Sequence, residues 1–177
     1  MKLNYVFIIL VLFVSNIELS AQQFNTVDRS PHDIAYYRPN KISPPIIKVL
    51  YGRPQKNGRE IFGKLVPYDK VWRLGANEAT EITFFQDVLF GGKEVKKGTY
   101  VMYAIPQEKE WTIILNSNLD VWGTYEYEEK YDIARVKAKV SKAESIEAFS
   151  IGFKDKNDKV LMVFAWDNTR VKVPVKL

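Results

Sequence analysis

The sequence predicts an all-β fold, a two-sheet antiparallel β-sandwich of jelly-roll type with long loops and little or no helix. In short runs along the chain, every second residue is apolar, as in strands with one buried face. Gly, Pro, Asn and Asp separate these runs, and no stretch has the period of an amphipathic helix. About nine runs follow residue 46, which is enough for two packed sheets.

In the first half of the domain, the predicted strands cover residues 46–51, the run around Ile82 and Phe84, residues 100–105 and residues 111–115. Before the third of these, the pair Gly91-Gly92 is typical of a two-residue hairpin, because both positions of such a turn need a positive φ.

The second half of the domain shows the clearest alternation. Residues 134–140 alternate small or branched apolar residues with Arg and Lys, and residues 149–153 repeat the pattern. A polar turn at residues 155–158 leads into residues 160–166, which are apolar on both faces and are therefore predicted to lie centrally in a sheet. The last run, residues 171–177, contains a proline and outward lysines, which predicts an edge strand.

The N-terminal segment, residues 1–21, has the layout of a signal peptide, with Lys2, an apolar run and a polar stretch that ends at Ala21. The apolar run is shorter than the roughly 20 residues that span a bilayer. We therefore expect cleavage near Ala21 and a periplasmic or secreted protein without a transmembrane segment. Residues 22–45 are polar and interrupted by prolines, which predicts an extended arm, and residues 46–177 are expected to form a single domain.

Composition limits the chemistry. The 177 residues contain no cysteine, which excludes lipid anchoring on cysteine, disulfides, thiolate metal sites and a cysteine nucleophile. The net charge is +5, but the basic residues are dispersed, so nucleic-acid binding is not expected. The one histidine, His32, lies in the arm without neighbouring metal ligands, and neither a metal nor another cofactor is expected.

Two long stretches do not fit the strand pattern, and loops of that length are usually functional or disordered. The first, residues 52–79, combines glycines with Arg53, Arg59, Arg73, Asn77 and Glu78. Arginine binds carboxylates and phosphates through two parallel hydrogen bonds, and glycine permits close approach to the backbone. The alternative is that these charges pair with one another and that apolar neighbours such as Trp72 bury the connection.

The second stretch, residues 116–131, contains Trp122, Tyr125 and Tyr127 beside acidic residues. Exposed aromatic rings next to carboxylates are typical of sugar-stacking surfaces, whereas packing in the core or at its rim is the alternative.

Enzyme motifs are largely absent from the sequence. It contains no G-x-S-x-G, H-E-x-x-H, G-x-x-x-x-G-K-[ST] or G-x-G-x-x-G motif, and one histidine nearly excludes the usual triads. Carboxylate chemistry remains, with Glu78 and Asp132 as weak candidates for an acid and base pair and Arg73 or Arg135 tuning one of them. Ion pairing of each carboxylate is the alternative.

Several strings of the sequence resemble a known family. They are Y-G-R-P at 51–54, G-R-E-I-F-G-K-L-V-P at 58–67 and V-W-R-L-G-A-N-E-A-T at 71–80, with shorter matches as far as residues 165–166. From about Ser43 to the C-terminus the chain is similar to the bacterial DUF2911 family, whose members look like exported proteins of Bacteroidetes-type bacteria. The resemblance implies no established function. It places the family signature on Arg53, Arg59, Arg73, Asn77 and Glu78, with Asp132 and Arg135 from a later strand.

We therefore expect an exported envelope protein that is a non-catalytic binding module for a small polar, anionic or carbohydrate-like ligand. The candidate ligand-binding residues are Arg53, Arg59, Arg73, Asn77, Glu78, Trp122 and Arg135. One alternative is a glycosidase-like hydrolase or lyase that uses Glu78 and Asp132. A second alternative is a purely structural envelope protein.

Overall fold

The computed structural model describes residues 24–177, so the predicted signal peptide lies outside the described residues. The strands are β1 (His32–Tyr37), β2 (Ile47–Gly52), β3 (Thr80–Phe84), β4 (Val88–Phe90), β5 (Lys93–Val95), β6 (Gly98–Pro106), β7 (Glu110–Asn116), β8 (Asp132–Lys156) and β9 (Lys159–Lys176), and a short 3₁₀ helix, η1 (Glu129–Tyr131), precedes β8. Over residues 24–177, no helix is long and apolar enough to cross a membrane.

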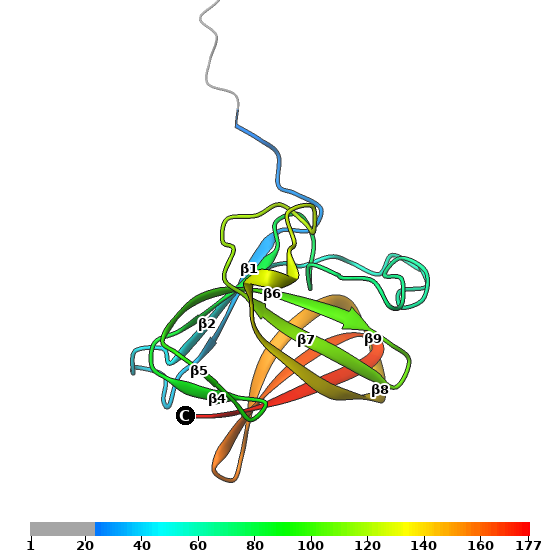
Figure 1. Cartoon of the computed structure of the whole chain (residues 1–177). Helices are drawn as coiled ribbons and strands as arrows, with labels where there is room; N and C mark the ends of the chain where they lie inside the picture. The colour runs from blue at the N-terminus through cyan, green and yellow to red at the C-terminus, as the bar shows by residue number, and fades with distance from the viewer. Residues whose placement is uncertain (1–23) are drawn as a thin grey trace, which may run out of the picture.

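The all-β prediction is confirmed, but the strands form one continuous antiparallel sheet and not two separate sheets. Their order is β1-β2-β3-β6-β7-β8-β9-β4-β5 (Figure 1). The reason is the length of β8, which belongs to both parts of the sheet. Its residues 132–139 pair with β7, and its residues 140–156 pair with β9.

The predicted strands 134–140 and 149–153 are thus two parts of β8, and the last two predicted strands are likewise both parts of β9. The register of β8 against β9 shifts between Lys142 and Ile146 and again between Ile146 and Ser150. Such irregularities add residues to one strand and bend it, so the two-residue period is lost there although the strand continues.

The edge-strand prediction for residues 171–177 is wrong. Val175 pairs with Phe90 of β4, and the Pro174 carbonyl accepts a hydrogen bond from the Gly91 N–H, so β9 lies inside the sheet. The edges are β5 and β1. β1 lies within the predicted arm, where the prolines flank a strand that pairs with β2 along its full length.

The glycine hairpin is confirmed between β4 and β5. Gly91 and Gly92 have φ values of 56° and 86°, the left-handed region that such a turn requires. A Cβ on Gly91 would also lie 2.2 Å from Cγ1 of Val136, so glycine here serves packing as well as the turn.

The curled sheet encloses the main hydrophobic core, and an aromatic cluster lies within that core. The rings of Phe62, Trp72, Trp111, Phe149 and Trp166 have centroid separations of 4.9 to 6.3 Å. Two of these rings come from the 52–79 loop, which is therefore partly a core segment.

A second, smaller cluster covers the outer face of β6 and β7. Val101, Tyr103 and Ile114 of these strands pack there against Ala79 and Val121, which come from the two long loops. Both faces of β6 and β7 are consequently buried, and the two loops are held together on the outside of the sheet.

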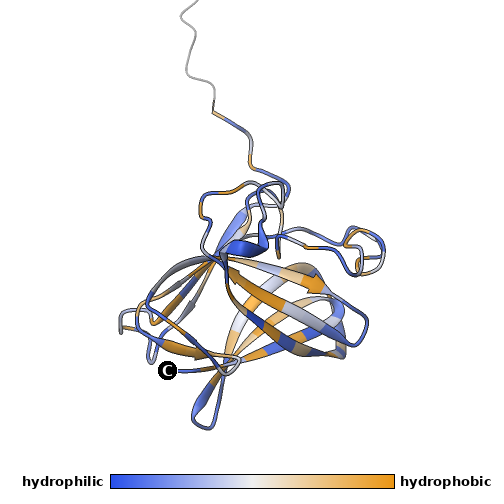
Figure 2. Cartoon of the chain, viewed as in Figure 1, coloured by the Kyte–Doolittle hydropathy of each residue, from blue (hydrophilic) through white to orange (hydrophobic). Residues whose placement is uncertain are grey.

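The sheet curls until the chain after β2 meets the middle of β8. The Lys56 N–H donates to the Glu147 carbonyl at 2.8 Å, and the Phe149 N–H donates to the Pro54 carbonyl at 2.9 Å. Both long loops and the N-terminal arm gather at one end of this body, while the turn between β8 and β9 projects from the opposite end (Figure 1). Figure 2 shows that this projecting turn is hydrophilic.

Candidate ligand-binding site

Residues 73–80 form a tight loop that closes on itself. The buried Thr80 donates its N–H to the Arg73 carbonyl and its hydroxyl to the Leu74 carbonyl, at 3.1 and 2.8 Å. Leu74 and Asn77 have positive φ values of 55° and 62°. Asn tolerates this region, whereas for Leu it is a strained conformation that the surrounding contacts must hold.

Two glycines let this loop rest directly on the end of β2. A Cβ on Gly52 would lie 2.0 Å from the Ala76 carbonyl oxygen, and a Cβ on Gly75 would lie 2.8 Å from the Gly52 carbonyl oxygen. Two backbones therefore touch at a place where no side chain fits between them.

A pocket of about 360 Å³ lies beside this loop. Its most buried lining residues include Trp72 and Trp166, whose rings stack with centroids 6.0 Å apart. The polar lining residues are Ser30, Arg59, Lys70, Arg73, Asn77 and Thr124. Three of these are cationic and none is acidic. Within residues 24–177, none of the three cations forms an ion pair.

Arg73 is the most enclosed of the three cations. Its Nε is buried and has no hydrogen-bond partner among residues 24–177. Burial lowers the pKa of its guanidinium, and the nearby Tyr125 acts in the opposite direction. Arginine still remains charged at neutral pH, so the loop holds a partly desolvated positive charge without an internal counter-ion.

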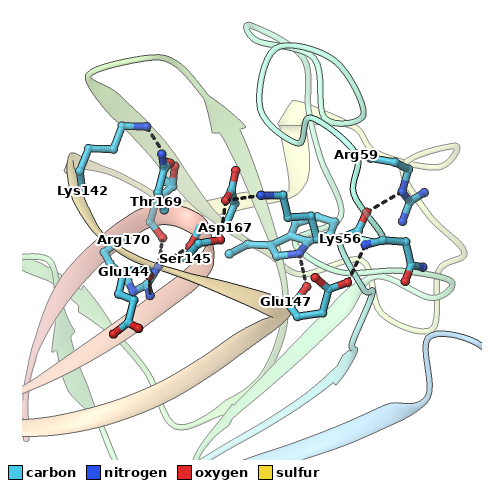
Figure 3. A network of polar contacts seen from close by, with 12 residues as sticks. Lys56, Arg59, Lys142, Glu144, Ser145, Glu147, Asp167, Thr169 and Arg170 are labelled. Carbon is cyan, nitrogen blue, oxygen red and sulfur yellow. Dashed lines mark hydrogen bonds and ion pairs between the residues drawn. The ribbon is translucent and has the colours of Figure 1, made fainter.

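Arg59 is positioned by a polar network that anchors residues 55–59 (Figure 3). Its guanidinium donates to the carbonyls of Lys56 and Gln55, at 2.9 and 2.6 Å. The Lys56 ammonium contacts Asp167 of β9 at 2.7 Å, and this hydrogen bond is the main reason that the pKa of Asp167 is lowered. The loop is thus fixed to the sheet, and the charge of Arg59 remains available.

Asn77 contacts the N-terminal arm at the margin of the pocket. The Ser30 N–H donates to Oδ1 of Asp28 at 2.6 Å, and this bond is the main reason that the pKa of Asp28 is lowered. The Asn77 side chain acts on this pKa in the same direction. Ser30 itself lines the pocket, so the segment before β1 forms part of its wall.

Glu78 does not join Arg73 and Asn77. Its Oε2 lies 3.1 Å from Nε2 of His32, and it lines a separate cavity together with Glu81 and Asp120. Of the candidate ligand-binding residues, Arg73 and Asn77 therefore line one cavity and Glu78 lines another.

Arg53 lies outside the pocket lining and connects β1 to β8. Its guanidinium contacts Asp33 of β1 and Ser150 of β8, both at 2.9 Å. Trp122 is also outside the lining. It forms a β-bridge with Glu78, and 53% of its surface is exposed.

Asp132 and Arg135 contact each other in a network that holds the second loop. The side chain of Asp132 is only 7% exposed and accepts hydrogen bonds from Asn116, Tyr127 and Arg135, at 2.8, 2.9 and 2.8 Å. Burial, and then the hydrogen bond to Asp132, raise the pKa of Tyr127 to about 12. Asp132 and Glu78 have separate partners and share none of the described contacts.

The alternative in which the charges of the first loop pair with one another is not observed. Arg53, Lys56 and Glu78 each pair with a residue outside that loop, namely Asp33, Asp167 and His32. Sequence reasoning missed Ser30, Lys70 and Thr124 as pocket residues. Ser30 and Thr124 reach the pocket from the arm and from the second loop, and no local pattern marks such a meeting.

A comparison with protein families matches residues 30–175 to the family described as "Protein of unknown function (DUF2911)". The chain belongs to this family. The matched DUF2911 region begins at Ser30 and so includes β1, the pocket and both long loops. Comparisons with curated proteins and with solved structures return no match.

Proposed function

We propose that this DUF2911 protein binds a small anionic ligand in the pocket beside residues 73–80 and does so without catalysis. The observation that carries the proposal is the unpaired and partly buried guanidinium of Arg73 in a pocket without acidic lining residues. Buried charges are normally paired, because desolvation penalises an isolated ion. An anion in the pocket would supply the missing partner.

The surroundings of Arg73 support this proposal. Arg59 and Lys70 add two exposed positive charges to the same pocket, and Asn77 offers a side chain that both donates and accepts hydrogen bonds. The volume of about 360 Å³ falls in the range of roughly 300–1,000 Å³ that is typical of small-molecule sites. Guanidinium groups bind carboxylates and phosphates with good geometry, so these are the anions we expect.

The arrangement favours binding over the carboxylate-based enzyme. Asp132 is nearly enclosed, and both of its oxygens accept hydrogen bonds within the protein. A general acid or base must instead reach a proton of the substrate.

We also propose that the protein acts in the periplasm or outside the cell of a Bacteroidetes-type bacterium. The support is the signal-peptide pattern of residues 1–21 together with the family resemblance.

The test is a thermal-shift and calorimetric screen with inorganic phosphate, sulfate, acetate and citrate. A ligand present at 100 times its dissociation constant stabilises the folded protein by about 2.7 kcal/mol. We expect at least one of these anions to stabilise the protein and the Arg73→Gln variant to lose that effect.

The matched control is Arg38→Gln, because Arg38 is also half-buried but donates to the Ser43 carbonyl far from the pocket lining. This variant should retain anion binding. No stabilisation by any of the four anions, or equal stabilisation of the Arg73→Gln variant, would overturn the proposal.

A further inference from the structure

The second long loop places an exposed aromatic ring beside the basic pocket. Thr124 lines the pocket, and the next residue, Tyr125, is 87% exposed. Thr124 shares the pocket lining with Arg73, which places Tyr125 at the margin of the pocket. In keeping with this position, the charge of an ionised Tyr125 raises the pKa of the Arg73 guanidinium. A ligand anchored on Arg73 would therefore have this ring at its side.

The loop that carries Tyr125 is held firmly. Asn116 donates to the Glu128 carbonyl at 3.1 Å, Asn118 donates to the Glu126 carbonyl at 3.3 Å, and the buried Asp132 accepts from Tyr127. Val121 of the same loop packs in the cluster on the outer face of the sheet. The exposed ring is thus presented by an ordered segment.

The backbone at Gly123 orients the ring further. Gly123 has a φ of 64°, and a Cβ there would lie 3.4 Å from two ring carbons of Tyr125. The ring therefore lies over Gly123, where no side chain intervenes, and most of its surface is exposed to solvent. Large exposed apolar surface at a fixed position next to a pocket is a feature of binding sites.

We propose that the ligand of this site is a saccharide with an anionic group, the carboxylate or phosphate being held by Arg73 and the sugar ring lying against Tyr125. The inference rests on the proposed function, because it assigns the anion to the same pocket. The pocket volume of about 360 Å³ is about twelve times the volume of one liquid water molecule, which leaves room for a monosaccharide beside its anionic group.

A sugar would use both the aromatic ring of Tyr125 and the polar residues that line the pocket. Its C–H groups can lie on an aromatic face, while its hydroxyls can exchange hydrogen bonds with Ser30, Asn77 and Thr124, which line the pocket. An inorganic anion would use the guanidinium but would leave the tyrosine ring without a function.

The test is isothermal titration calorimetry with five probes. Glucose 6-phosphate is compared with inorganic phosphate, glucuronate is compared with acetate, and glucose provides the neutral sugar. We expect at least one acidic sugar to bind about tenfold more tightly than its simple anion, and glucose to bind far more weakly than either acidic sugar. The two pairs distinguish a phosphate from a carboxylate as the anionic group.

Variants of Tyr125 test whether its ring causes the tighter binding of the acidic sugar. Tyr125→Ala should reduce the affinity for the acidic sugar about tenfold and leave the affinity for the simple anion unchanged, whereas Tyr125→Phe should retain both. Because Tyr125 is exposed, neither change should affect folding, which the thermal midpoint verifies. Tyr36→Ala, at an exposed tyrosine of β1, is the matched control.

The outcomes separate the two proposals. If simple anions bind but the sugar adds no affinity, or if Tyr125→Ala weakens sugar and anion alike, the saccharide inference is wrong and the anion site stands. If neither anions nor acidic sugars bind, both proposals are wrong.

Discussion

Two charged residues of the family signature, Asp132 and Arg73, have opposite environments in the structure. Asp132 is surrounded by three hydrogen-bond donors, whereas Arg73 has a buried Nε without a described partner. Both residues belong to the strings that resemble the DUF2911 family. Asp132 is therefore a structural residue that orders the second loop. The Nε of Arg53 is likewise buried and unpartnered, but Arg53 is paired with Asp33, whereas Arg73 has no ion-pair partner among residues 24–177.

A further residue-scale consequence concerns Tyr103, which is 1% exposed and packs edge-on against Tyr127 with ring centroids 5.0 Å apart. Burial, and then the charges of Glu126 and Asp132, raise its pKa to about 12. In the unfolded chain its hydroxyl ionises near pH 10. The folded state therefore prefers the protonated hydroxyl, so stability is complete below about pH 10 and is lost as the pH rises towards 12.

Between pH 9 and pH 11, the free energy of unfolding of the unsubstituted protein should fall. We predict that it falls by about 1 kcal/mol less in the Tyr103→Phe variant, because phenylalanine cannot ionise. Urea unfolding of both proteins at the two pH values measures this change. Tyr36→Phe, at an exposed position, should leave the alkaline loss unaltered. An alkaline loss that is identical in the Tyr103→Phe variant would show that this residue does not titrate as inferred.

At the scale of elements, the position of the 73–80 loop depends on its backbone contact with the end of β2. Gly52 and Gly75 permit that contact, and Thr80 closes the loop through two hydrogen bonds. The sequence string around Trp72 thus encodes a loop shape as well as a set of side chains. The shape sets where Arg73 and Asn77 meet the pocket.

We predict that Gly52→Ala lowers the free energy of unfolding by about 2–3 kcal/mol, since its Cβ would overlap the Ala76 carbonyl and displace the loop. The same variant should lose phosphate affinity in calorimetry. Gly152→Ala in β8 is the control, because no atom lies within 4 Å of its added Cβ, and its stability should change by less than about 0.5 kcal/mol. Equal stability of the two variants would contradict the close backbone contact.

At the scale of the whole molecule, the site forms because the sheet curls until the chain after β2 contacts β8, a contact that we call the closure. The chain after β2 meets β8 through the Gln55–Ala148 bridge and two flanking hydrogen bonds, and Arg53 links β1 to β8 nearby. This contact carries the first loop to the aromatic cluster, so that Trp72 and Trp166 from distant parts of the chain line one pocket.

We predict that Arg53→Gln loosens this closure, because the substitution removes the guanidinium that contacts both Ser150 of β8 and Asp33 of β1. Hydrogen exchange measured by NMR should show at least tenfold faster exchange of the Lys56 and Phe149 amides, which bridge the closure. Amides between β6 and β7 should keep their protection, and Arg38→Gln should behave as the unsubstituted protein. Unchanged protection of the two bridging amides would show that Arg53 does not hold the closure.

The sequence by itself determined the all-β class, the Gly91-Gly92 hairpin, the family and the loop that carries Arg73 and Asn77. These features are local, because the two-residue period, the glycine pair and the signature strings are all properties of neighbouring residues. The alternation fails at the irregular part of β8 around Ile146, and this is why one strand of the structure was predicted as two.

Only the tertiary structure decided which charged residues share a pocket and which have partners. Glu78 contacts His32 of β1, Arg53 pairs with Asp33, and Thr124 of the second loop lines the same pocket as Arg73. These pairings depend on how far the sheet curls and on where its closure places the two long loops. Because the residues involved lie far apart in the chain, no pattern of neighbouring residues specifies them.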